Sequence, residues 1–164
     1  KDMLDIRKSF EPRAEELAKK YALAPYTMFI GSGALWGETI LFSMCILEEM
    51  QWKRTRYITS ADFFHGTLEL VEPGVPVFLF MGEDENRKLD ERVRAFLTRG
   101  VTGDTDINVI DTAEFAIPGL DDEFRVIVSP WILTVLVTDR LARYYETVTK
   151  HNLKYRRYYH QFDY

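Results

Sequence analysis

Several features that would assign a chain to a class of protein are scarce or missing here. The 164 residues include a single cysteine, Cys45, so the chain cannot form a disulfide within itself. Lysine and arginine number 21 against 26 aspartates and glutamates, and this net charge of −5 argues against a nucleic-acid-binding protein, because no cationic surplus is available to neutralise phosphates. No run of 18 apolar residues occurs, and residues 1–4 do not resemble a signal peptide. We therefore expect a cytoplasmic protein with no nucleic-acid or membrane partner.

The remaining composition is typical of one globular domain with a full hydrophobic core, with 46% hydrophobic and 29% charged residues. Cys45 falls in the apolar run 40–47, which favours a buried, structural thiol over a reactive one. Position 1 is a lysine rather than an initiator methionine, which suggests a fragment of a longer chain.

Strand and helix patterns alternate along the chain, which predicts an α/β domain: a three-layer α-β-α sandwich with a mostly parallel sheet. Strands are expected at 26–30, 54–59, 75–81 and 107–110, of which 26–30 and 75–81 read as buried. Helices are expected from the glycine-containing turn to about residue 50, at 85–99 and at 129–151. We divide the chain into a linking helix within 1–24, the α/β domain at 25–151 and an aromatic tail at 152–164 that docks on the domain.

Local signals predict where three helical segments begin. Pro12 lies inside the first helical pattern, and we expect the regular helix to begin there, with the preceding residues in a separate turn or helix. Ser60 is expected to cap a short helical turn that ends at Gly66. Ser129 and Pro130 are expected to be the N-cap and the first residue of a long helix that ends near residue 151.

A glycine-containing turn, Gly31-Ser32-Gly33, follows the first predicted strand and leads into a helix. Such a turn exposes backbone N–H groups to an anion. The match to a dinucleotide-binding fingerprint is partial, because the third glycine, Gly37, comes one position late. An anion-binding turn and a tight strand-to-helix turn without a ligand are both compatible with this pattern.

The stretch 48–71 carries the candidate chemistry. Glu49 ends a predicted helix, and His65 follows sixteen residues later in a Phe-Phe-His-Gly turn. A carboxylate and an imidazole on neighbouring loops are the minimum requirement for proton transfer near neutral pH. On spacing alone, a solvated glutamate and a structural histidine remain open alternatives.

Residues 62–76, D-F-F-H-G-T-L-E-L-V-E-P-G-V-P, resemble a motif of the sugar isomerase (SIS) domains, E-F-x-H-G-P-L-E-I-V followed by P-x-V-P. Glu49 stands where that family has its catalytic glutamate. Residues 156–159, Arg-Arg-Tyr-Tyr, resemble the tail of the fructosamine 6-phosphate deglycases. The chain is thus similar to the C-terminal SIS half of these deglycases, which are relatives of the isomerase part of glutamine–fructose-6-phosphate aminotransferase. A SIS-type, Rossmann- or flavodoxin-like fold is implied.

The resemblance implies that Glu49 moves a proton between C1 and C2 of an Amadori amino-sugar phosphate, and that His65 assists ring opening or proton transfer at the ring oxygens. The imine so formed would be hydrolysed to glucose 6-phosphate and an amine. The tail would dock near the active site, and substrate contacts are expected from Gly31, Ser32, Gly33, Tyr159 and His160. Neither a cofactor nor a metal is implied, and the expected assembly is a homodimer or higher homo-oligomer built through SIS domains.

The chain also departs from the family pattern. Thr67 replaces the usual proline after His-Gly, and His160 stands where the aminotransferases have a lysine near the C-terminus. Ile46 stands where they have a second lysine, which argues against a glucosamine-6-phosphate synthase. The Ser/Thr-rich phosphate loop of the family's first SIS half has no counterpart in these 164 residues, so we expect half of a site.

Three alternatives to an enzyme half of this kind remain. They are a non-catalytic SIS module that binds a sugar phosphate and regulates, the isomerase domain of an aminotransferase, and a half that serves dimerisation. The chain has no DNA-binding segment and retains both Glu49 and His65, which favours the enzyme.

Overall fold

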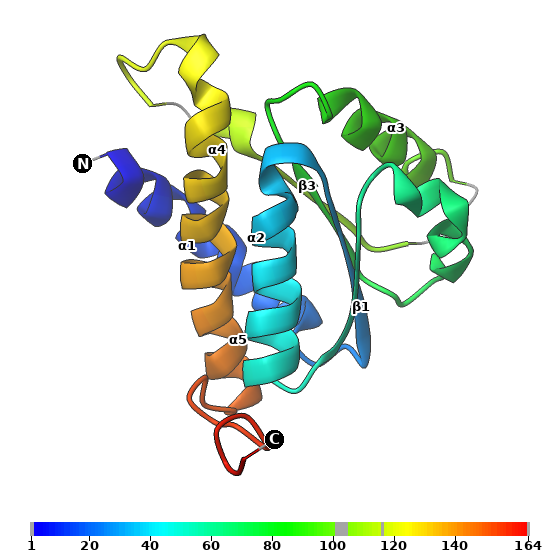
Figure 1. The fold of residues 1–164 in the computed structure, drawn as a ribbon, viewed down its shortest axis with the longest axis vertical. Coiled ribbons are helices and arrows are strands. Elements are labelled where there is room, and N and C mark those ends of the chain that lie inside the picture. The colour runs from blue at the N-terminus through cyan, green and yellow to red at the C-terminus, as the bar shows by residue number, and fades with distance from the viewer. Residues whose placement is uncertain (1, 101–104, 116, 164) are drawn as a thin grey trace.

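A parallel four-stranded sheet lies at the centre of the computed structural model, which describes residues 2–100, 105–115 and 117–163 (Figure 1). The strands are β1 (Tyr26–Gly31), β2 (Arg54–Ile58), β3 (Val77–Met81) and β4 (Ile107–Asp111), and their spatial order is β2-β1-β3-β4. All four predicted strands are confirmed, with small differences at their ends.

The central strands β1 and β3 are covered on both faces. Met28 pairs with Val77 in register, and every residue of β3 is buried. Because successive side chains of a strand point to opposite faces, Phe78 and Phe80 join one hydrophobic cluster while Val77 and Leu79 join the other. This double burial explains the continuous apolar run in the sequence of β3.

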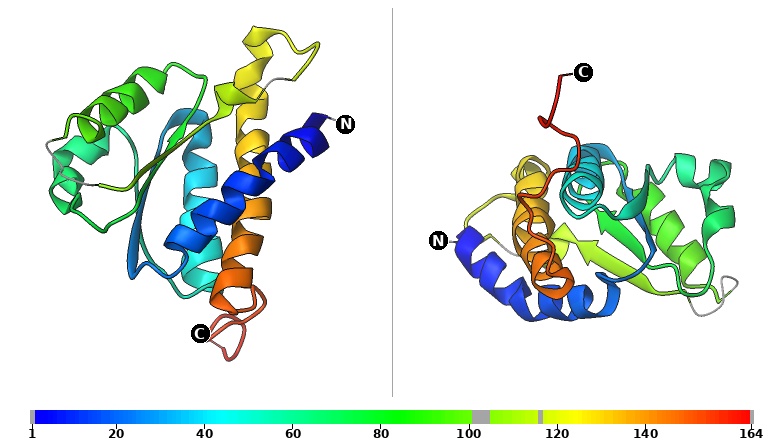
Figure 2. Two further views of the ribbon diagram at one scale, coloured as in Figure 1. Left: turned by 180° about the vertical axis from the view of Figure 1, so that it is seen from behind. Right: turned by 90° about the horizontal axis from the view of Figure 1, so that it is seen from below.

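Helices cover the two faces unequally (Figure 2). The larger layer contains α1 (Asp2–Tyr21), α2 (Trp36–Ile40) running on into η2 (Leu41–Met50), and α4 (Arg125–Leu133) running on through η7 (Thr134–Leu141) into α5 (Ala142–Thr149). The other layer contains η3 (Asp62–His65), η4 (Thr67–Leu70) and α3 (Arg87–Leu97). Short turns η1 (Gly33–Leu35), η5 (Thr112–Glu114) and η6 (Asp122–Phe124) complete the chain. The predicted three-layer α/β fold is confirmed.

Two segments of the larger layer, η2 and η7, are π-helical and contact each other. Side-chain hydroxyls bond back to the backbone just before and at the start of η2: Thr39 donates to the Leu35 carbonyl at 2.8 Å and Ser43 to the Thr39 carbonyl at 2.6 Å. Such back-bonding competes with the regular helix ladder. Segments of π-helix are frequent near functional sites, and η2 carries Glu49 in its last turn.

The structure corrects two predicted helix starts. Helix α1 begins at Asp2 and continues through Pro12, which is exposed, so the prediction that the regular helix begins at Pro12 was wrong. The later helix begins at Arg125 rather than at Ser129. Because Pro130 has no N–H to donate to the Val126 carbonyl, the Ser129 hydroxyl approaches that oxygen instead, at 3.2 Å.

Two smaller predictions were also wrong. Cys45 is half-buried rather than buried, and burial together with the nearby carboxylates of Glu49 and Glu48 raises the pKa of its thiol. Ser60 does not cap η3, since its hydroxyl donates to Asp90 and the residue before the helical turn is Ala61.

Among the described residues, no helix combines the length and apolar content that a membrane span requires.

Candidate functional site

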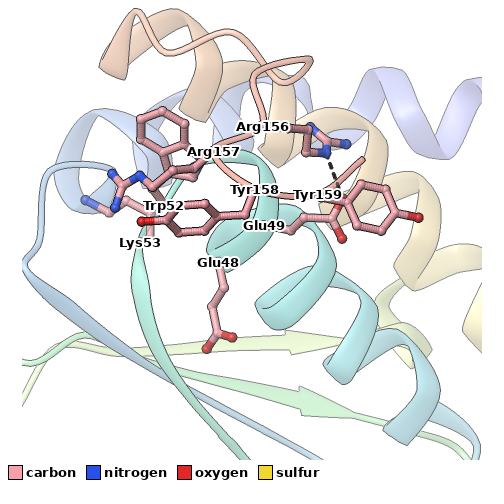
Figure 3. Close-up of a pocket in the computed structure, with 8 residues that line it drawn as sticks. All are labelled: Glu48, Glu49, Trp52, Lys53, Arg156, Arg157, Tyr158 and Tyr159. Atoms are coloured by element: carbon pink, nitrogen blue, oxygen red, sulfur yellow. Dashed lines mark ion pairs between the residues drawn. The ribbon is translucent and has the colours of Figure 1, made fainter. Parts of the chain in front are cut away.

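Glu49 lies in the last turn of η2, at the edge of the sheet where β2 begins. Its carboxylate oxygen Oε1 lies 2.9 Å from Nε of Arg156 in the C-terminal tail, and both side chains are largely shielded from solvent (Figure 3). The Arg156 guanidinium also donates to the carbonyls of Leu153 and Tyr155, each at 2.8 Å. The tail is thereby attached to the end of η2 through this arginine.

A pocket of about 370 Å³ surrounds this pair of residues. Its walls come from the end of η2, the turn that follows it, and the tail: Glu48, Glu49, Trp52, Lys53, Arg156, Arg157, Tyr158 and Tyr159. Figure 3 shows Arg157, Trp52 and Lys53 on one side of the pocket and Arg156 with Glu49 on the other. We name the first group the cationic side and the second the Glu49 side.

The two neighbouring glutamates have different environments. Glu48 points away from the tail residues, and its Oε1 accepts a hydrogen bond from the Thr55 hydroxyl at 2.5 Å (Figure 3). Glu49 instead turns toward the tail and Arg156. Successive residues of a helix point in different directions, so only Glu49 presents its carboxylate to Arg156.

The cationic side is built on an unusual backbone conformation. Trp52 has a φ of 52°, in the left-handed region that residues with a side chain seldom adopt. Its indole ring contacts the His151 ring, at 4.4 Å between centroids, and the Arg157 guanidinium, at 4.3 Å from the ring centroid. Burial lowers the pKa of the adjacent Lys53 ammonium.

His65 is not brought to this pocket. It ends η3, is exposed, and comes after β2, whereas Glu49 precedes β2. Strands β1 and β2 are parallel, and the helix that connects them runs back along the sheet. Glu49 therefore lies at the end of the sheet where the strands begin, and His65 lies at the end where they finish. The two groups predicted on neighbouring loops therefore cannot meet within one copy of the chain.

The turn at Gly31, Ser32 and Gly33 is occupied by a side chain of the protein itself. The Ala34 N–H donates to Oδ2 of Asp84 at 2.6 Å, and a Cβ added to Gly33 would lie 2.2 Å from the same oxygen. The buried Ser32 hydroxyl accepts the Ser60 N–H at 2.7 Å. A carboxylate thus stands where an anion was predicted to bind, and these three residues have roles in the fold. Their substrate contacts stay a prediction.

Asp90 connects the segments that follow β2 and β3. Its carboxylate is buried and accepts the Ser60 hydroxyl at 2.5 Å, with the Gly82 N–H at 3.4 Å. Burial raises the pKa of Asp90 to about 6. Ser60 begins the segment that leads to His65, so this carboxylate helps to hold that segment on the sheet.

In the tail, Tyr159 lines the pocket and His160 does not. The two rings are in edge-to-face contact at 4.2 Å, and both side chains are exposed. Their predicted substrate contacts also stay predictions. Sequence reasoning did not assign site roles to several of the residues that line the pocket: Trp52, Lys53, Arg156 and Arg157. The Arg-Arg-Tyr-Tyr likeness of the tail was the available signal for the two arginines.

The side chains of the pocket include carboxylates, cations and aromatic rings. In the ranges that the structure describes, no group of three or more His, Cys, Asp or Glu side chains is arranged to hold a metal ion. The pocket presents the Glu49 carboxylate with Arg156 beside it and with Lys53 and Arg157 on the other side.

No established family profile matches the chain. It is 30% identical over 148 residues to fructosamine deglycase FrlB of Bacillus subtilis (strain 168), covering 88% of this chain and 43% of that protein. It is 30% identical over 155 residues to fructoselysine 6-phosphate deglycase of Escherichia coli (strain K12), covering 93% of this chain and 42% of the relative.

Solved structures agree with these relatives. A Bacillus subtilis protein assigned to the phosphosugar isomerases superposes with a TM-score of 0.90 at 28% identity, over 99% of this chain and 48% of that one. The chain is a SIS domain related to the fructosamine deglycases. The C-terminal domain of glucosamine-fructose-6-phosphate aminotransferase from Francisella tularensis shares the fold, with a TM-score of 0.61 at 14% identity. This SIS domain spans less than half the length of the curated relatives it matches.

Proposed function

We propose that this SIS domain is one half, the C-terminal one, of an enzyme that removes the amine from a fructosamine 6-phosphate, with Glu49 as the acid–base group. The observation that carries the proposal is the position of Glu49, whose carboxylate is turned into a pocket walled by cationic and aromatic side chains. Relatives that match about nine-tenths of the chain are deglycases of fructosamines and of fructoselysine 6-phosphate.

The chemistry needs one carboxylate that takes and returns a proton. Glu49 removes a proton from C1 of the open-chain Amadori compound, which leaves an enolamine between C1 and C2. Return of the proton to C2 moves the double bond to C1 and nitrogen, giving an imine. Water then adds to C1 and the amine leaves, so the products are glucose 6-phosphate and the free amine.

Arg156 supports the first of these steps. Its Nε lies 2.9 Å from Oε1 of Glu49 and holds the carboxylate at the wall of the pocket. Arg156 belongs to the tail, so we propose that the tail docks at the active site and that residues 152–164 act with the domain.

His65 enters this site from another subunit. Because Glu49 and His65 lie at opposite ends of β2, a His65 that acts beside a given Glu49 would belong to a second copy of the chain. We therefore propose a homodimer or higher homo-oligomer in which each site combines Glu49 of one copy with His65 of the other. His65 would protonate or deprotonate the ring oxygens during ring opening.

The 6-phosphate requires donors beyond the turn at Gly31, Ser32 and Gly33, because Asp84 accepts the Ala34 N–H there. We propose that another SIS half contributes these donors. A substrate bound between SIS halves would also be shielded from water during the proton transfer.

The test is release of glucose 6-phosphate from fructoselysine 6-phosphate by the assembled protein that contains this chain. Glu49→Gln removes the proton acceptor while keeping the shape of the side chain, and turnover should fall by about 10²-fold or more. Glu48→Gln is the matched control, since the Glu48 carboxylate is bonded to Thr55 and is turned away from the tail residues and Arg156. Full turnover by Glu49→Gln would contradict the proposal.

A further inference from the structure

The cationic side of the pocket carries positive charge that the protein does not neutralise. Arg156 is paired with Glu49, and the Glu48 carboxylate is bonded to Thr55. Within the part of the chain that the structure describes, neither Lys53 nor Arg157 has a carboxylate within ion-pair distance. Two cations on one wall of a pocket form a local field that attracts an anion.

Contacts within the protein position the backbone of Lys53 and the guanidinium of Arg157. Trp52 and Lys53 are tied to the end of η2, because their N–H groups donate to the carbonyls of Glu48 and Leu47 at 3.1 and 2.8 Å. The Arg157 guanidinium rests on the Trp52 ring. Groups that are already ordered lose less conformational freedom on binding, which favours a specific ligand contact.

The backbone of Trp52 adds an independent observation. A side-chain-bearing residue in the left-handed region costs conformational energy, and such residues gather at ligand-binding positions. This conformation directs the chain from η2 into β2 so that both Trp52 and Lys53 line the pocket. A tight connection alone does not require two large side chains facing the same cavity.

We propose that Lys53 and Arg157 form an anion subsite that binds a charged group of the substrate away from the carbon on which Glu49 acts. This inference rests on the proposed function, and it deepens that function by giving the substrate a second anchor. An arginine presents paired donors that match a carboxylate or a phosphate, and a lysine adds a point charge.

Two groups of a fructosamine 6-phosphate have the required chemistry. One is the carboxylate of an amino acid that supplied the amine, and the other is the 6-phosphate of the sugar. The first would make the subsite a determinant of which amines are accepted, because an adduct of an amine without a carboxylate would lose the contact. The Trp52 ring beside the cations would then pack on the alkyl part of the amino acid.

The experiment measures binding without turnover, in the assembled protein carrying Glu49→Gln. Calorimetry gives the Kd of two ligands, fructoselysine 6-phosphate and the matching adduct of cadaverine, which lacks the carboxylate. Lys53→Gln and Arg157→Gln are added singly to this background. Lys154→Gln is the matched control, since Lys154 is an exposed cation of the same tail outside the pocket.

Each subsite variant should weaken fructoselysine 6-phosphate by about tenfold, the effect of one charge-assisted contact at a partly exposed site, while the control is unchanged. A loss confined to the lysine adduct identifies the carboxylate, and an equal loss for both adducts identifies the phosphate. Unchanged Kd values for both adducts, or no binding of either by the Glu49→Gln protein, overturn the subsite. Failure of the proposed function is seen separately, as turnover by Glu49→Gln equal to that of the parent protein.

Discussion

Arg156 of the tail and Glu49 of η2 form an ion pair with 2.9 Å between Nε and Oε1, although 107 positions separate them in the sequence. The arginine is mostly buried and the glutamate about two-thirds buried. This contact attaches residues 152–163 to the domain at the point where we place the reaction. Loss of this contact would therefore release the tail and would also remove the cation beside Glu49.

We predict that Arg156→Gln releases the tail from the end of η2. Backbone amides around residues 153–159 should exchange faster with solvent, and the coupling between Arg156→Gln and Glu49→Gln in a double-mutant cycle should be about 1 kcal/mol, as for a partly exposed ion pair. The measurement is hydrogen exchange combined with urea unfolding. Arg143→Gln, which removes a more exposed pair with Asp139, is the control. Equal exchange in both variants would mean that Arg156 does not hold the tail.

Gly33 and Gly37 form a matched pair for testing the occupied turn. Gly33 has a φ of 54° and lies against Asp84, whereas a Cβ at Gly37 would meet nothing within 4 Å. Gly33→Ala should lower the free energy of unfolding by about 2 kcal/mol or more. Gly37→Ala should raise it by up to about 1 kcal/mol, because alanine favours a helix. Thermal unfolding of both variants checks this, and a harmless Gly33→Ala would contradict the close approach of Asp84.

Asp90 predicts a specific dependence of stability on pH. Burial raises its folded pKa to about 6 from an unfolded value of 3.8. A raised folded pKa contributes stability that is complete below the unfolded pKa and is lost as the pH rises through the folded one. Relative to Asp90→Asn, the parent protein should therefore lose on the order of 3 kcal/mol between about pH 4 and pH 7.

Urea unfolding across this pH range measures the Asp90 effect. The exposed Asp163→Asn variant is the control and should follow the parent curve. If the difference between the parent protein and Asp90→Asn stayed constant from pH 4 to pH 7, the Asp90 carboxylate would not be ionising in the folded state with a raised pKa.

The opposite placement of Glu49 and His65 predicts complementation between subunits. Proteins carrying Glu49→Gln or His65→Ala should each be nearly inactive toward cyclic substrate. Mixed oligomers assembled from both variants should regain part of the activity, because some sites then contain an intact Glu49 from one copy and an intact His65 from the other. Glucose 6-phosphate release by co-expressed and co-purified variants is the readout, and mixtures no more active than their parents would argue against a shared site.

Much of the fold could be predicted from local sequence. The apolar run of β3 and the glycine turn after β1 indicated a parallel α/β sheet, and the strand ends were close to correct. Helix starts were less predictable where a proline lies within the helix, because Pro12 and Pro130 are tolerated by solvent exposure and by the Ser129 hydroxyl. Those compensations depend on tertiary position rather than on the local pattern.

The site was predicted less completely than the fold. Glu49 was predicted as a site residue and lines the pocket, but its partner Arg156 comes from the far end of the chain, and no local spacing predicts that contact. Asp84 reaches the turn at Gly33 from fifty residues away for the same reason. The separation of Glu49 from His65, by contrast, follows from parallel topology, since a helix that returns between parallel strands ends at the opposite edge of the sheet.

The central claim is that Glu49 moves a proton from C1 to C2, and isotopic labelling of the substrate tests it most directly. Fructoselysine 6-phosphate carrying two deuterium atoms at C1 is turned over by the assembled protein, and the sugar product is analysed by mass spectrometry and NMR. The account predicts glucose 6-phosphate with one deuterium at C1, formed at a rate that falls at least about 10²-fold in Glu49→Gln. Fructose 6-phosphate that retains both deuterium atoms at C1 would contradict it, since the carbon–nitrogen bond would then have been broken without proton transfer.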